Sequence, residues 1–146
     1  MGHRARLAAQ ALLALAMAAA WPAAQTLTSE AEALWAQGLR SEAVNLLEQG
    51  LERTPQDREL RARLAEHLMG VHRYAAAAEV AEALGPSHAG LRGRALYLIG
   101  DYDDALELLR QDDPLEALMR VDAHEVLGHE AAVVREALTV AEALLP

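Results

Sequence analysis

Hydrophobic residues recur along most of the chain at the spacing of α-helices. Leu60, Leu64 and Leu68 follow one another at intervals of four residues, and residues 41–53 repeat the pattern with Val44 and Leu47. This spacing places the apolar side chains on one face of a helix. Short breaks that contain Gly, Pro or Asp separate the periodic segments. The pattern therefore predicts a series of amphipathic helices and an all-α fold.

The predicted helices pair into hairpins, each made of a helix, a short turn and a second helix. The pairs span residues 29–53, 56–84, 87–110 and 114–145, with turns at Gly38, Gly70–Arg73, Gly100–Asp101 and Gly128–His129. Ser29 and Glu32 have the spacing of a capping box at the start of the first helix. Asp113 precedes a proline at the first helical position, which predicts an N-cap for the seventh helix.

The turns resemble those of the tetratricopeptide repeat (TPR) family. Residues 37–44 read QGLRSEAV and residues 100–106 read GDYDDAL. The family has Gly in the turn, an aromatic residue two positions later, a small residue five after the Gly, and Pro at the end of the second helix. Ala43, Ala77 and Ala105 match the small position. The resemblance is moderate over residues 28–111 and weak over 114–145.

The resemblance implies a right-handed α-solenoid of about four antiparallel hairpins. Its units are expected at about 29–55, 56–85, 86–112 and 113–146, within a repeat array over residues 25–146. From Ala43 to Ala77 is the family period, but Ala105 follows sooner, so the second helices of units two and three should be shortened by one to two turns. Gly70 comes two positions early in its turn. Val133 occupies the small position of the last unit, which is therefore either a repeat or a cap.

Residues 1–24 have the three parts of a secretory signal peptide. Arg4 and Arg6 precede an uncharged segment over residues 7–20, and small residues follow. Cleavage is expected after Ala20 or Ala24. The apolar segment is shorter than the roughly 20 residues that cross a bilayer. We therefore expect an exported protein, periplasmic or secreted, without stable membrane insertion after cleavage; the alternative is an uncleaved segment that tethers the chain to the membrane.

Composition excludes several classes of function. Ala and Leu supply 59 of the 146 residues, and the formal net charge is −9. Without residues 1–24 the chain has 11 Arg against 22 acids and a net charge of −11. No stretch is basic enough for nucleic acid. Because the chain lacks Cys, disulfides, thiolate catalysis and Cys-zinc sites are also excluded.

No motif points to catalysis or to a metal. The chain has no Gly-x-Ser-x-Gly elbow, no phosphate-binding Gly-rich loop and no HExxH motif. His67 and His72, like His124 and His129, are five residues apart across a predicted turn, so we interpret them as turn or surface residues rather than metal ligands. The acids of residues 101–104 fit a helix N-terminus better than a calcium loop. We expect no enzymatic activity, no cofactor and no metal.

The resemblance also implies a binding groove, which the first helix of each pair lines. Three residues before the turn position lie Trp35, Met69 and Tyr97, and one helical turn earlier lie Glu66 and Arg94. An apolar row of this kind suits a helix or an extended peptide. The alternative is that these large side chains pack between hairpins. The Lys and Asn cluster that clamps a peptide carboxylate in some family members is absent, and Arg63 and Arg94 are the nearest substitutes.

The last helix has an unusually wide apolar arc, which includes Val133, Leu138 and Leu144. Repeat arrays commonly end in a helix with a polar outer face. Contact with a partner or with a second copy of the chain would cover this arc; tolerance of an alanine-rich surface is the other explanation. The sequence thus predicts a non-catalytic protein-binding module outside the cytoplasm, in envelope assembly or secretion. The alternative is a self-associating structural spacer.

Overall fold

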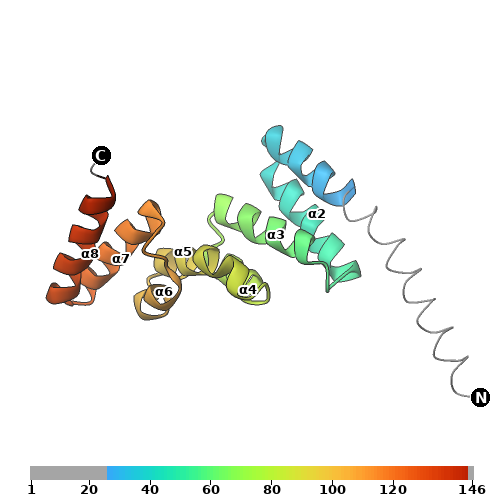
Figure 1. Ribbon diagram of the computed structural model, residues 1–146. Helices are drawn as coiled ribbons and strands as arrows, with labels where there is room; N and C mark the ends of the chain where they lie inside the picture. Colours follow the sequence, from blue (N-terminus) through green and yellow to red (C-terminus); the bar gives the residue numbers. More distant parts are fainter. Residues whose placement is uncertain (1–25, 145–146) are drawn as a thin grey trace, which may run out of the picture. The chain divides into compact units, whose positions relative to one another are not determined.

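The computed structural model describes residues 26–144, and Figure 1 shows their helices. The signal-peptide prediction and both cleavage sites lie outside the described residues. A helix over residues 26–36 comes first and is followed by α2 (Arg40–Arg53), α3 (Arg58–Gly70), α4 (Tyr74–Glu82), the short 3₁₀ helix η1 (Pro86–His88), α5 (Ala89–Ile99), α6 (Tyr102–Leu108), α7 (Pro114–Val126) and α8 (Glu130–Leu144). Residues 26–144 contain no strand, so the fold is all-α, of the TPR-like α-solenoid class.

The helices fall into two compact units, one up to Arg63 and one from Leu64, and α3 runs through the boundary. In the first unit, Gly50 of α2 is the point of close approach. A Cβ atom at Gly50 would lie 3.2 Å from Leu27 and 3.4 Å from Leu60. Around it, the buried core consists of Ala31, Ala43, Val44, Leu47 and Leu60.

The capping-box prediction at the start of the first helix is wrong. Residues 26–28 are already helical, so Ser29 lies inside the helix and not at its N-cap. Thr28 is only 7% exposed, and Leu27 lies against Gly50 of α2. Because these residues pack on the neighbouring helix, tertiary contact extends the helix beyond the local start signal.

In the second unit the helices from α4 onward pack on their neighbours in the sequence. Helix α5 contacts α4, α6 and α7, and α7 contacts α6 and α8. The second helices of the middle hairpins are short, as the sequence predicts: α4 has 9 residues and α6 has 7, against 14 in α2. Ala43, Ala77 and Ala105 are completely buried, which confirms them as the positions that only a small side chain fills. Val133 of the last hairpin is half-buried.

The turns within hairpins share one left-handed residue. Gly38, Gly100 and Gly128 have φ angles of 81°, 88° and 73°. In the second hairpin this position is held by His72, with φ of 62°, and α3 continues through Gly70, which we had predicted to begin the turn. The early glycine is therefore not the turn residue, and the repeat register runs through His72 to Ala77. A side chain in this conformation costs about 1 kcal/mol relative to glycine.

We expect His72→Gly to raise the free energy of unfolding by about 0.5–1 kcal/mol, because strain in the folded turn is relieved by more than the unfolded chain gains in entropy. Gly100→Ala is the matched control, since no atom lies within 4 Å of its added Cβ and only the backbone conformation opposes it. That control should lose stability by a similar amount. Urea denaturation followed by circular dichroism measures both, and a less stable His72→Gly variant would contradict the assignment.

Candidate partner-binding surface

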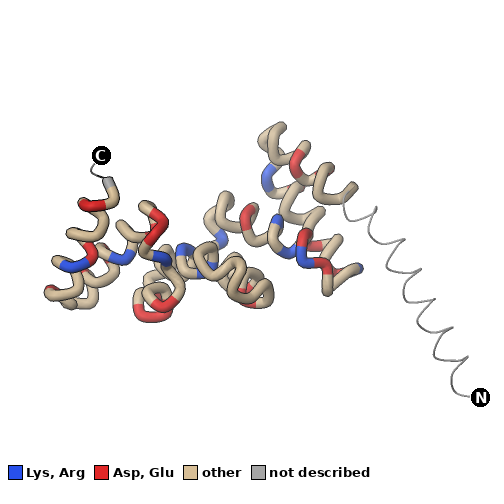
Figure 2. Tube along the Cα trace, viewed as in Figure 1, with Lys and Arg blue, Asp and Glu red and all other residues tan. Residues whose placement is uncertain are grey.

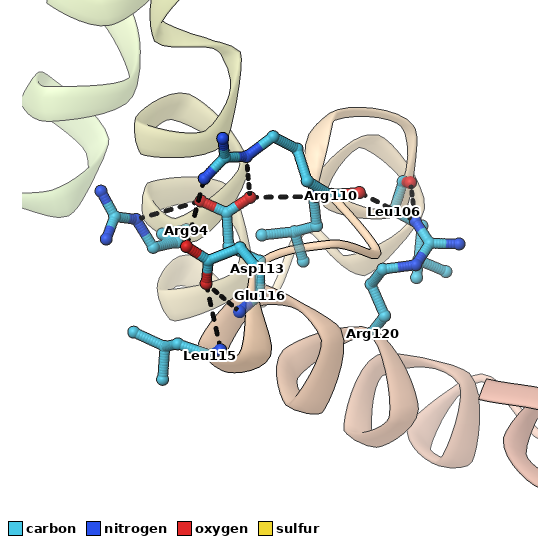
Figure 3. Close-up of polar contacts among 8 residues, drawn as sticks. Arg94, Leu106, Arg110, Asp113, Leu115, Glu116 and Arg120 are labelled. Carbon is cyan, nitrogen blue, oxygen red and sulfur yellow. Dashed lines mark hydrogen bonds and ion pairs between the residues drawn. The ribbon is translucent and has the colours of Figure 1, made fainter. Parts of the chain in front are cut away.

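Two buried carboxylates hold the third and fourth hairpins together, and the first is Glu116 of α7. Its side chain is only 2% exposed and accepts hydrogen bonds from the backbone N–H and the Nε of Arg110, at 3.0 and 3.1 Å. Arg94 of α5 lies 3.8 Å away on the other carboxylate oxygen. Figure 3 shows both guanidinium groups converging on this carboxylate. A buried carboxylate is stable only with such partners. Glu116 therefore holds together α5, α7 and the connection between α6 and α7.

Local sequence places Glu116 at this point. Asp113 caps α7, with its Oδ1 accepting hydrogen bonds from the backbone N–H groups of Leu115 and Glu116 at 3.0 Å, as the sequence predicts. These bonds, that of Glu116 first, lower the pKa of Asp113 below its usual value. On the facing helix, a Cβ at Gly90 would come within 2.4 Å of the Glu116 carboxylate. Only glycine leaves room for the carboxylate against α5.

The second buried carboxylate is Glu136 of α8, whose side chain is 4% exposed. Arg120 of α7 donates to it at 2.9 Å, and Gln111 at 3.1 Å. Through its other terminal nitrogen, Arg120 also donates to the carbonyl oxygens of Leu106 and Leu109, at 2.6 and 3.1 Å. Figure 3 shows Arg120 reaching Leu106. The carbonyls at the end of a helix have no partner within the helix. Arg120 therefore completes the C-terminal end of the short helix α6 and joins it to α8.

The predicted groove residues Arg94 and Tyr97 lie one helical turn apart on α5. The hydroxyl of Tyr97 donates to Asp122 of α7 at 2.6 Å, and its ring packs edge-on against Tyr102 of α6, with ring centroids 5.6 Å apart. The hydrogen bond to Asp122, followed by burial, raises the pKa of Tyr97 to about 12. Tyr97 thus links three helices, and only part of its surface is exposed.

Glu66 and Arg94 line one hollow in the second unit, of about 270 Å³, together with η1, the start of α5, Arg110 and Glu116. Met69 is half-buried near the end of α3. In the first unit, the ring of Trp35 is half-buried with the Arg40 guanidinium 5.3 Å from its centroid. Arg63 lies 3.7 Å from Glu32, and both side chains are about half exposed. That Trp35, Met69 and Tyr97 form one row remains a prediction.

The structure adds an apolar surface that the sequence analysis missed. Leu115, Leu118 and Val126 of α7 are 51%, 53% and 58% exposed. They share a helix face with Asp122, at spacings of three and four residues. Because Asp122 bonds to Tyr97, this face adjoins α5. We call Tyr97 with these three residues the α5–α7 surface. Counting back from Gly128, as from the turn residues of the other hairpins, reaches Glu125 and, one helical turn earlier, Asp122. This count would have pointed to the same face of α7.

Two histidines differ from their sequence interpretation as turn or surface residues. His67 of α3 is buried, with 5% exposure. The side chain of His124 is 12% exposed and its Nδ1 lies 3.2 Å from Nδ1 of His129 across the turn. Burial, followed by the nearby Arg120 charge, lowers the pKa of His124. The packing of α7 on α8 brings the rings of His124 and His129 together, which their five-residue spacing alone does not predict. Within residues 26–144 no group of three or more metal-ligating side chains occurs.

The predicted contact residues of α8 differ in their exposure. Val133 is half-buried, whereas Leu138 is 60% exposed together with Val134 at 61%. Leu144 ends the helix, and its side chain is outside the described part of the chain. Glu136 and Val140 form the buried side of the helix instead. Between residues 26 and 144, no helix has the length and apolar character that crossing a bilayer requires.

Hairpins of antiparallel helices, a fully buried alanine at the crossing of each of the first three hairpins and a left-handed residue in each turn define a TPR-like helical-repeat fold. In agreement, a tetratricopeptide repeat family model matches residues 34–97. The fold is similar to that of MamA 41-end from Desulfovibrio magneticus RS-1, with a TM-score of 0.73 and 16% identity over 82% of this chain and 75% of that chain. For MamA D159K mutant 1 the TM-score is 0.74 and the identity 16%, over 82% and 77%. No curated protein matches the sequence.

We expect Glu136→Gln to show how much the charge of the second buried carboxylate contributes to the free energy of unfolding. The hydrogen bond from Arg120 lowers the pKa of Glu136 below its usual value of 4.5. A pKa that is lower in the folded state stabilises the fold above about pH 4.5, and this contribution is lost as the pH falls through the folded-state value. The variant should therefore lose about 1–3 kcal/mol at neutral pH, and this loss should shrink as the pH falls below about 4.5.

Urea denaturation at a series of pH values from neutral downward measures the difference, with the exposed Glu130→Gln on the same helix as a control that should change stability little. An equal loss at every pH would show that the charge of Glu136 is not what stabilises the hairpin.

Proposed function

We propose that this chain is a protein–protein interaction module that binds a partner segment on the α5–α7 surface. The observation that carries the proposal is the exposure of Leu115, Leu118 and Val126 on one helix face beside Tyr97. Exposed apolar residues gathered on one face mark contact sites, whereas scattered ones do not. A TPR-like fold supports the same class of function by analogy.

The chemistry of this surface favours an amphipathic helix or peptide with apolar anchors and basic neighbours. The apolar face of such a helix would cover Leu118 and Val126. Asp122 and Glu125 are exposed on the same helix. Acids outnumber arginines in the chain as a whole, and Figure 2 marks both along the described helices. An acidic surround selects for basic partners and against acidic ones. The hollow beside Arg94 and Glu66 offers a polar subsite at one end of α5.

The proposal is non-catalytic. The polar clusters of the second unit hold helices together: Glu116 pairs with Arg94 and Arg110, and Oε1 of Glu136 pairs with Arg120. Neither carboxylate is free to accept a proton from a substrate, because each is engaged as an ion-pair partner. A scaffold that presents an apolar surface fits these clusters better than an acid–base site does.

Site-specific photo-crosslinking tests the binding surface. A photoreactive phenylalanine analogue in place of Leu118 or Val126 should crosslink to the partner in the cells that produce the protein. The same analogue at Glu107, exposed on α6, should not. Leu118→Arg with Val126→Arg should reduce recovery of the crosslinked partner at least tenfold, since two buried apolar anchors are worth more than 1.4 kcal/mol. Crosslinks of equal strength from Glu107 would remove the α5–α7 surface as the binding site.

We further propose that the protein is exported and works in the periplasm or outside the cell, in envelope assembly or secretion. The support is the sequence of residues 1–24. An alkaline phosphatase fusion to the full chain should be active, and replacing Leu13 and Leu15 by Arg should abolish that activity because the apolar core is interrupted. Retained activity of the variant fusion would contradict signal-dependent export. N-terminal sequencing of the exported protein would then distinguish cleavage from a membrane tether.

A second candidate function is self-association, the alternative that the sequence predicts. It is favoured by the exposure of Val134 and Leu138 on α8.

A further inference from the structure

We propose that α8 pairs with α8 of a second copy of the chain, antiparallel and about a two-fold axis beside Leu138. The contact face consists of Ala131, Val134, Leu138 and Ala141, all exposed. It is separate from the α5–α7 surface, so the inference rests on the second candidate function, self-association, and not on partner binding at that surface.

The spacing of this face is that of a helix–helix contact. Its members follow one another at steps of three, four and three residues, which is the spacing of side chains that interdigitate between two helices. Val134 and Leu138 are 61% and 60% exposed. The side of α8 that packs within the chain, with Glu136 and Val140, is turned the opposite way. No described element covers the contact face, because the hairpin partner α7 lies on the other side.

The charges beside this face fit a second copy in one orientation. Arg135 and Glu142 flank the same edge of the contact face, two helical turns apart, and both are exposed. When two such helices run antiparallel with Leu138 against its counterpart, Arg135 meets the partner's Glu142 and Glu142 meets the partner's Arg135. Val134 then lies near the partner's Ala141. One symmetric placement thus satisfies both the apolar and the charged positions, as a two-fold contact between identical surfaces requires.

The small residues at the ends of the face allow the helices to approach closely around Leu138. With α8 about 22 Å long, the contact is small. It belongs to the weak class of interfaces, with a dissociation constant on the order of tens of micromolar. Pairing through α8 would join two chains while leaving each α5–α7 surface open.

Sedimentation equilibrium on the full chain, over a concentration range of about 1 µM to 1 mM, tests the pairing. Wild type should form a dimer. Leu138→Glu should remain a monomer over this range, and Leu118→Glu on α7 should dimerise like wild type. Circular dichroism confirms that both variants remain helical. A wild-type monomer at the highest concentration, or dimerisation lost in Leu118→Glu and kept in Leu138→Glu, would overturn the proposal.

Charge reversal tests the orientation. Arg135→Glu and Glu142→Arg should each weaken the dimer about tenfold at low salt, because each replaces two attractive contacts by two repulsive ones. The double variant exchanges the charges and should restore wild-type affinity. Absence of this rescue would rule out the antiparallel arrangement.

The lack of cysteine in the chain allows a second test of orientation. Leu138→Cys should form a disulfide-linked dimer under mild oxidation, since the two sulfur atoms meet near the axis. Ala131→Cys should not, because antiparallel pairing separates the two copies of this residue by roughly 20 Å. Efficient crosslinking of Ala131→Cys would indicate a parallel pair and overturn the proposal.

Discussion

The second unit depends on burying two carboxylates together with arginines. Glu116 and Glu136 are almost completely inaccessible, and each would be strongly destabilising without its cationic partner. Their value lies in what the arginines reach at the same time. Arg110 connects Glu116 to the α6–α7 connection, and Arg120 connects Glu136 to the carbonyl oxygens at the end of α6.

These contacts compensate for the shortened helices. The second helix α6 has only 7 residues, so it offers few apolar side chains for its neighbours to bury. The carbonyl oxygens of its last turn have no partner within the helix. Arg120 supplies the missing hydrogen bonds from the next hairpin. Polar side chains thus stabilise the packing of α6. Around the longer α2, buried apolar side chains such as Val44 and Leu47 stabilise the packing.

With the polar residues committed to the interior contacts, large apolar residues remain on two outer faces. On α7 they adjoin Tyr97, and on α8 they lie opposite Glu136. The same carboxylates that fix how the hairpins pack therefore determine which faces stay open. In our two proposals, the face on α7 binds a different partner and the face on α8 binds a second copy of the chain.

The sequence by itself determined the helices, their pairing into hairpins and the crossing alanines, because helical periodicity, turn residues and the small residue five positions after the turn are local signals. It also predicted the shortened α4 and α6 and the cap at Asp113. Only tertiary structure decided what depends on contact between hairpins. Leu27 and Thr28 extended the first helix through packing, His72 took the left-handed position, and His67 and His124 became buried. Helical spacing defines a face of α7 but not the neighbour that this face meets. Only the hydrogen bond between Tyr97 and Asp122 shows that the face adjoins α5.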